Sequence, residues 1–178
     1  MIKIFGRQLF FDFHHLIYDY IVSNIFFYSV LDYELVTSDF KRIDMGYFSI
    51  RMLKKVLKRN PEYSKCYLFK TKKESIIVGF ALVSYRGAKD IHYRVKDTDA
   101  FITALGVFAK QRGRGYSQEI LKCLANICRT KGLKTLSLSV DSDNYVAINA
   151  YEKFGFLKRK EVRFKRIASI DFLLHNDV

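Results

Sequence analysis

The fold of this chain is decided by the stretch Leu105-Gly-Val-Phe-Ala-Lys-Gln-Arg-Gly-Arg-Gly-Tyr-Ser117. An apolar run typical of a β-strand ends at Val107, a short basic loop with two glycines follows, and an amphipathic helix is expected from Gly115. Glycines let backbone N–H groups approach a phosphate closely, and a helix N-terminus favours its negative charge. Arg112 and Arg114 add fixed positive charge to this loop. The stretch therefore predicts a site for a phosphorylated ligand.

Two other kinds of phosphate-binding loop match this stretch less well. A Walker A loop ends in Gly-Lys-Ser/Thr, and the sequence contains no such ending. The dinucleotide fingerprint G-x-G-x-x-G is partly present in Gly113 and Gly115, and Asp141 closes the next strand, where a ribose-binding acid would lie. However, Gln118 stands at the third glycine position, and five residues separate the end of the strand from the first glycine.

A third kind of phosphate-binding loop matches this stretch better. Arg112-x-x-Gly115-x-Ser117 resembles the Arg/Gln-x-x-Gly-x-Gly/Ala loop of the GNAT acyltransferases, which binds the pyrophosphate of acetyl-CoA in that family. Ser117 departs from the usual Gly or Ala but is still small. Because the order of strands and helices also fits, the resemblance extends in outline from residue 31 to residue 174.

A second segment, at residues 138–156, carries the same resemblance. Asn144, Ala147, Tyr151 and the pair Gly155-Phe156 match the family pattern Asn-x-x-Ala-x-x-x-Tyr-x-x-x-Gly-Phe at every marked position. The joint spacing of the two motifs makes coincidence a poor explanation. The resemblance implies an α/β (α+β) fold with a mixed, largely antiparallel sheet flanked by helices, and a splayed parallel strand pair at the cofactor site.

The resemblance also implies a role for each matching residue. Tyr151 corresponds to the family's general acid, two helical turns after Asn144, and its alternative role is that of a core tyrosine. The N–H of Val107 would donate to the thioester oxygen, and Asn144 would contact the pantetheine arm or serve as a helix N-cap. No metal is expected. The cofactor-binding residues implied are Leu105, Gly106, Val107, Arg112, Gly113, Arg114, Gly115, Tyr116, Ser117 and Asn144.

The sequence does not reveal a general base. Some relatives carry a glutamate on one of two strands, but the matching positions here are Phe101 and Ser139. A water chain through Thr103, His92 or Tyr93 is an alternative. Neutralising a lysine side chain at pH 7 costs roughly 4–5 kcal/mol, whereas an α-amine costs only about 1 kcal/mol. An acceptor amine of low pKa is therefore favoured.

Composition sets wider limits. The 178 residues are 49% hydrophobic and 28% charged, as in a globular protein with one main domain. The net charge of +13 suits anionic partners such as coenzyme A or nucleic acid, and its alternative role is solubility alone. The same charge mildly disfavours polycationic acceptors. Charged and polar residues interrupt the apolar residues 8–31, which argues against a membrane span and favours a cytoplasmic protein.

The cysteines point to a reducing compartment. Cys66, Cys123 and Cys128 form no CxxC pair and no disulfide framework. Small buried side chains are the favoured interpretation, and a nucleophile that carries an acyl group is the alternative.

The chain divides at residue 30. Residues 1–30, rich in Phe, Tyr and Ile, are expected to be an extension that packs on the main domain, and their aromatic density also allows a homodimer contact. Residues 31–178 form the GNAT-like domain. Helices are expected at residues 14–27, 49–59, 115–131 and 144–154, and strands at residues 33–36, 66–70, 75–86, 99–108 and 135–140, followed by a hairpin at residues 156–174.

Three functions compete at this point. The first is an N-acetyltransferase that moves an acetyl group directly from acetyl-CoA to a primary amine, on a small molecule or a protein amino terminus. The second is a GNAT-fold module that binds acyl-CoA without turnover. The third, a basic nucleic-acid-associated domain, gives no reason for the spacing between Asn144 and Tyr151.

Overall fold

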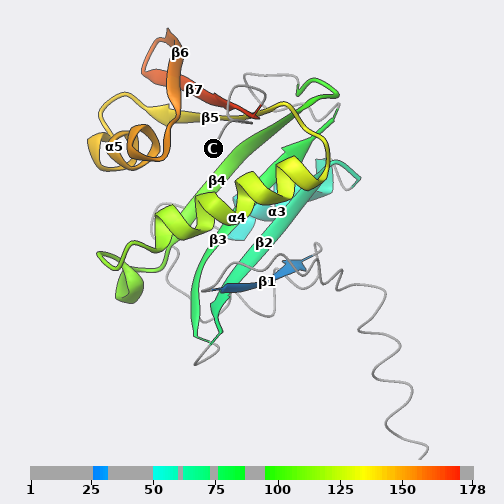
Figure 1. Cartoon of the computed structure of the whole chain (residues 1–178), viewed down its shortest axis with the longest axis vertical. Coiled ribbons are helices and arrows are strands. Elements are labelled where there is room, and N and C mark those ends of the chain that lie inside the picture. Colours follow the sequence, from blue (N-terminus) through cyan, green and yellow to red (C-terminus); the bar gives the residue numbers. More distant parts are fainter. Residues whose placement is uncertain (1–25, 32–49, 60–61, 73–75, 87–94, 173–178) are drawn as a thin grey trace, which may run out of the picture.

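The computed structural model describes residues 26–31, 50–59, 62–72, 76–86 and 95–172 (Figure 1). Within these ranges seven strands form one sheet in the order β1-β2-β3-β4-β5-β7-β6. Neighbouring strands are antiparallel except for the parallel pair β4 and β5. The strands are β1 Phe26–Leu31, β2 Ser64–Thr71, β3 Ile77–Tyr85, β4 Asp99–Val107, β5 Thr135–Asp141, β6 Leu157–Val162 and β7 Lys165–Asp171. The predicted mixed, largely antiparallel fold is confirmed.

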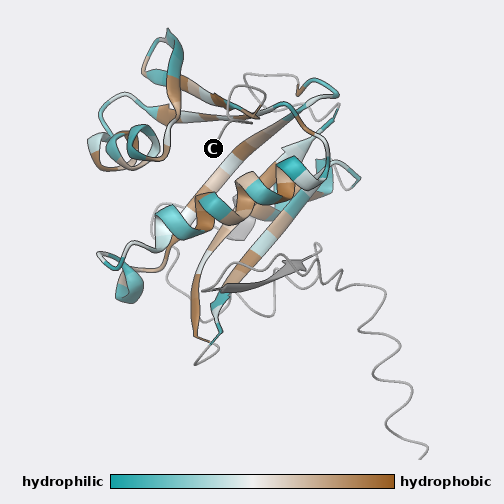
Figure 2. Ribbon diagram, in the orientation of Figure 1, coloured by the Kyte–Doolittle hydropathy of each residue, from teal (hydrophilic) through white to brown (hydrophobic). Residues whose placement is uncertain are grey.

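Helices cover both faces of this sheet. The helix α4 (Tyr116–Thr130) buries the predicted stripe of Ile120, Leu124 and Ile127 on one face, in the same core as Ile148 of α5 (Tyr145–Phe154). The helix α3 (Ile50–Arg59) places Leu53 in a second core on the opposite face. Figure 2 shows the hydrophilic side of α4 turned away from the largely hydrophobic strands behind it. Burial of each large apolar side chain contributes about 1.5–3 kcal/mol, so these stripes fix where the helices lie.

The parallel pair determines where a ligand can enter. The ladder between β4 and β5 runs only from Asp99 to Ile102 on β4, opposite Thr135 to Leu138 on β5. Both strands continue beyond the ladder, and Figure 1 shows them diverging. The register of β4 against β3 shifts at the same point, because Ala104 pairs with Leu82 while Ile102 pairs with the adjacent Val83. Thr103 is thus the extra residue of a β-bulge, which bends a strand locally. The expected splayed pair is confirmed.

The strand β1 lies at residues for which the sequence predicted no strand. The sequence placed a helix at residues 14–27 and the first core strand at residues 33–36, whereas β1 occupies Phe26–Leu31 and pairs with β2. The helix prediction was wrong for Phe26 and Phe27, since aromatic residues suit a strand as well as a helix. Residues 1–25 and 33–36 lie outside the described ranges. The role predicted for residues 1–30 stays a prediction, although β1 crosses the boundary placed after residue 30.

Candidate active site

The glycine loop leads directly into the N-terminus of α4. After β4, a short 3-10 turn (Ala109–Gln111) precedes Gly113 and Gly115, whose φ angles of 75° and 78° lie in the left-handed region that favours glycine. Gly115 is the N-cap of α4 and offers no side chain to the first turn. The first N–H groups of a helix generally lack partners within the helix, and at the start of α4 the capping Gly115 is exposed beside the exposed Arg112 and Arg114. This arrangement suits an anion such as a pyrophosphate.

Besides its positive charge, Arg112 contributes a hydrogen bond that the sequence did not predict. Its Nε donates to the carbonyl oxygen of Val107 at 3.1 Å, so the side chain folds back onto the end of β4. Arg114 is exposed and lies on the other side of Gly113. Arg112 therefore braces the loop against the strand in addition to supplying charge.

The backbone of β4 directs polar groups into the region where β4 and β5 diverge. Phe108 donates its N–H to Val78 at 3.0 Å, and in an antiparallel ladder alternate residues point to opposite sides. Phe108 and Gly106 therefore face β3, while Leu105 and Val107 turn their N–H groups toward the side of β5. There the ladder has ended, so these groups can meet an inserted ligand. The side chains of Leu105 and Val107 pack against the main core.

The packing around residue 106 requires a glycine there, independently of any ligand. A Cβ at this position would lie 2.7 Å from the ring of Phe80. Across the ladder, a Cβ at Gly79 would lie 2.4 Å from the carbonyl oxygen of Gly106 and 2.9 Å from Ile120 of α4. The pair of glycines thus lets β3, β4 and α4 approach closely. The requirement at Gly79 was not foreseen, because an isolated glycine in an apolar run carries little information.

Asn144 and Tyr151 lie on α5, as the motif predicted. Asn144 caps the helix, its Oδ1 accepting from the N–H of Ala147 at 3.2 Å, and its side chain stays exposed. The Tyr151 ring packs against the core, 5.8 Å from the ring of Phe156. Burial raises the pKa of Tyr151 to about 12, so its hydroxyl is protonated at neutral pH and available as a donor.

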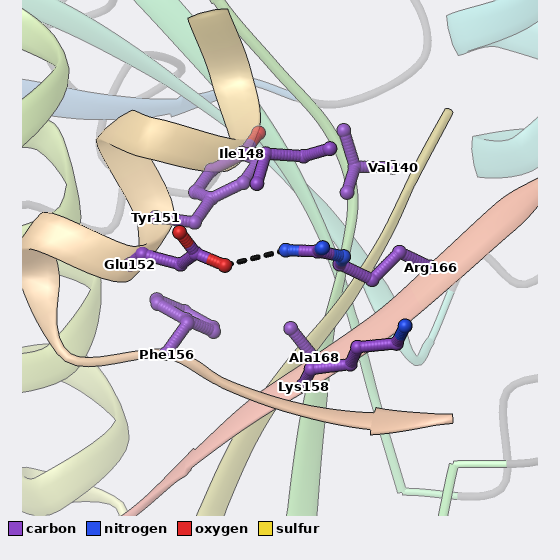
Figure 3. Close-up of a pocket in the computed structure, with 8 residues that line it drawn as sticks. All are labelled: Val140, Ile148, Tyr151, Glu152, Phe156, Lys158, Arg166 and Ala168. Carbon is purple, nitrogen blue, oxygen red and sulfur yellow. Dashed lines mark hydrogen bonds and ion pairs between the residues drawn. The ribbon is translucent and has the colours of Figure 1, made fainter. Parts of the chain in front are cut away.

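A small pocket lies beneath α5, beside Tyr151 (Figure 3). An ion pair between Glu152 of α5 and Arg166 of β7 crosses it, and the Tyr151 hydroxyl is directed away from this pair. Its apolar lining is Val140, Ile148, Phe156 and Ala168. The pocket thus lies between α5 and the strands β5 and β7, and Val140 belongs to the part of β5 beyond its ladder with β4.

On the face of the sheet that α3 covers, Thr103 joins a row of hydroxyl groups. Its Oγ1 lies 3.0 Å from the Oγ of Ser84, which lies 3.0 Å from the Oγ of buried Ser64. Ser84 and Ser64 were not identified from the sequence, because they lie on different strands. Phe101 is buried and Ser139 is partly exposed. His92 and Tyr93 lie outside the described residues.

The three cysteines are free thiols and all are buried. Burial raises the pKa of Cys66 to about 12 and that of Cys128 to about 12, with Lys131 and Arg129 acting against burial at Cys128. A thiolate is the reactive form, so these two side chains are poor nucleophiles. An acyl-cysteine route therefore has no support at either position.

Replacing Cys128 with alanine is expected to make the free energy of unfolding fall less steeply as the pH rises above about 8.5. A thiol whose pKa is raised by folding contributes stability that is complete below its unfolded pKa, about 8.5. That stability is lost as the pH rises toward about 12, at up to about 1.4 kcal/mol per pH unit. Urea unfolding at several pH values between 8 and 10.5 measures the slope. Ile127→Val, which keeps the thiol, should retain the wild-type slope, and equal slopes in both variants would contradict the assignment.

The structure contains neither a metal-binding cluster nor a membrane-spanning helix among the residues that it describes. Among the residues it describes, no three His, Cys, Asp or Glu side chains are grouped so that they could hold a metal ion. None of the helices in those same ranges is both long and apolar enough to cross a membrane.

The chain is similar to several known acetyltransferases. It is 35% identical over 69 residues to YycN of Bacillus subtilis, named as an N-acetyltransferase, and this match covers 39% of the chain but only 44% of that relative. The spermidine/spermine N-acetyltransferase SpeG of Vibrio cholerae has a similar structure, with a TM-score of 0.62 and 14% identity, over 85% of this chain and 99% of that one. An IAA acetyltransferase from Bacillus cereus gives a TM-score of 0.58 and 12% identity, over 83% and 99%.

At 12–14% identity these solved structures show a shared fold only. The match to a family is based on sequence and covers more of the chain than the match to YycN. The sequence profile of the acetyltransferase (GNAT) family matches residues 32–156. This range contains the glycine loop, the diverging strands and all of α5. The chain therefore belongs to the acetyltransferase (GNAT) family, as the two motifs predicted.

Proposed function

We propose that this protein is an acetyl-CoA-dependent N-acetyltransferase that transfers the acetyl group directly to a primary amine. One observation carries the proposal: β4 and β5 separate between the anion-suited N-terminus of α4 and the helix that bears Tyr151. The diverging strands can accept an extended pantetheine arm, with its pyrophosphate at Gly113–Ser117. Bound acetyl-CoA supplies an activated thioester.

The residues of this chain hold that thioester and its leaving group. The N–H of Val107, directed away from β3, is placed to donate to the thioester oxygen as negative charge develops on it. Leu105 and Gly106 would line the arm, and the exposed side chain of Asn144 could still donate to it through the amide nitrogen. The hydroxyl of Tyr151 would donate a hydrogen bond to the departing sulfur.

The pKa of Tyr151 limits how this hydroxyl acts. A thiol with a pKa near 8.5 is a stronger acid than Tyr151, whose pKa is about 12. Complete transfer of the proton would thus be uphill by roughly 4–5 kcal/mol. A hydrogen bond to the developing thiolate avoids that cost, and we therefore assign Tyr151 the role of hydrogen-bond donor.

We propose an acceptor with a low pKa, on a protein amino terminus or a small molecule. No carboxylate stands at the two positions where some relatives carry a base, Phe101 and Ser139. The net charge of +13 repels polycations such as the polyamines for which SpeG is named. The three buried cysteines form no disulfide, which supports a cytoplasmic location.

The experiment begins with calorimetric titration of coenzyme A and of a short DNA duplex into the full chain. We expect saturable binding of coenzyme A, and preferential binding of the duplex would favour the nucleic-acid alternative. A set of amines is then assayed with acetyl-CoA by thiol release. Peptides with a free α-amine should show a severalfold higher kcat/KM than acetylated peptides that offer only lysine, with a smaller difference at higher pH. Binding without turnover of any amine would favour the non-catalytic module.

A further inference from the structure

Gln118 connects the two helices that hold opposite ends of the proposed cofactor. Its Nε2 donates to the backbone carbonyl of Ala150 on α5 at 2.8 Å, in a partly buried contact. Its own N–H donates to the carbonyl of Gly115 at 3.0 Å. Ala150 immediately precedes Tyr151. A single residue therefore links the N-cap of α4 to the backbone beside the catalytic hydroxyl.

We propose that Gln118 is a positioning residue that sets the place of Tyr151 relative to the cofactor loop. The inference rests on the proposed function, because it gives the loop and Tyr151 their roles. The pyrophosphate is fixed at one end of α4, while the sulfur must meet a hydroxyl carried by another helix. The fit between them depends on how α4 and α5 lie against each other. A displacement of about 1 Å at a reacting group can cost on the order of 100-fold in rate.

The chemistry of this contact suits such a role. The acceptor is a main-chain oxygen, which moves with the helix as a whole, whereas a side-chain acceptor could rotate away. A carbonyl oxygen has two lone pairs, so Ala150 can receive Gln118 while keeping its helical hydrogen bond. The donor lies in the first turn of α4, next to the loop. A displacement of the loop therefore also displaces the backbone of α5.

Three substitutions test the contact. Gln118→Leu removes the donor at similar size, Gln118→Asn keeps the amide but is one methylene too short, and Gln118→Glu faces the carbonyl with a carboxylate. For Gln118→Leu and Gln118→Asn, coenzyme A affinity should stay within about twofold of wild type, because the loop is unchanged, while kcat should fall roughly tenfold. Gln118→Glu should lower kcat as well, and its added negative charge should also weaken coenzyme A binding. Lys122→Ala, on the exposed side of α4, is the matched control and should change neither quantity.

A double-mutant cycle separates positioning from general stability. In the Tyr151→Phe background, Gln118→Leu should lower kcat by less than twofold, because there is no hydroxyl left to misplace. An equal loss in both backgrounds, or no loss in the wild-type background, would overturn the proposal. Gln118→Asn takes the place of Gln118→Leu in this cycle if the leucine variant does not fold.

A measurement without turnover keeps the two proposals distinguishable. In protein labelled with 3-fluorotyrosine, the ¹⁹F resonance missing from Tyr151→Phe belongs to Tyr151. We expect Gln118→Leu to shift or broaden this resonance and Lys122→Ala to leave it unchanged, and an unchanged resonance in Gln118→Leu would refute the positioning role. If wild-type protein shows no coenzyme A binding, the proposed function fails, whatever the resonance does.

Discussion

The variant Gly115→Val is expected to bind coenzyme A about 100-fold more weakly while still unfolding cooperatively. Gly115 has a φ angle of 78°, and a Cβ there would meet nothing within 4 Å, so the substitution causes no collision. A valine in this backbone region nevertheless costs roughly 1–3 kcal/mol. The loop can relieve that strain by turning its N–H groups away from the ligand, and about 1.4 kcal/mol corresponds to tenfold in affinity.

The other end of α4 provides the matched control. Gly132 has a φ angle of 67° and equally open surroundings, so Gly132→Val introduces the same strain far from the loop. Calorimetric titration of coenzyme A should give near-wild-type affinity for this variant. Wild-type affinity in a cooperatively folded Gly115→Val would reject the site. Arg112→Ala should have a smaller effect, up to about tenfold, because backbone dipoles supply part of the attraction.

The variant Tyr151→Phe is expected to lower turnover by up to about 100-fold and to leave coenzyme A binding nearly unchanged. Loss of one positioned acid or donor typically costs about 10²–10⁴-fold. We expect the low end because the high pKa of Tyr151, about 12, prevents full proton transfer. Phenylalanine keeps the packing against Phe156, so stability should change little.

The pH dependence identifies the role of this hydroxyl. Tyr151 stays protonated from pH 6 to pH 9, so its own titration does not affect the rate in this range. The thiolate becomes stable without help as the pH passes about 8.5, and the deficit of Tyr151→Phe should shrink there. Thiol release followed with a chromogenic disulfide measures this trend. A rate equal to wild type at every pH would make Tyr151 a core residue only.

Local signals were sufficient to predict much of the fold. The glycine loop, α4 and α5 depend on spacing within a few turns of chain, and the structure places them within one or two residues of the prediction. The strand β1 was not predicted, because it is defined by its pairing with β2, which lies more than thirty residues further along the chain. The bulge at Thr103 was not predicted either, since it exists only as a mismatch between two strands.

The same distinction holds for the candidate site. Motif residues such as Asn144 and Tyr151 could be identified because their spacing is itself a pattern. Gln118 was noticed only as a missing glycine, and its partner Ala150 lies 32 residues away on another helix. Side chains that act through long-range partners leave no periodic trace in a single sequence.

The short ladder between β4 and β5 has a consequence for handling the protein. A sheet normally has two edges. Because the ladder between β4 and β5 ends at Ile102 and Leu138, the strand ends beyond it form two further edges within the sheet. Edges invite pairing with other chains and so promote aggregation. A ligand lying between the strands would cover both internal edges at once. Protein with nothing between these strands therefore exposes more surface for self-association than its strand order suggests, and we expect coenzyme A, bound there as proposed, to reduce aggregation.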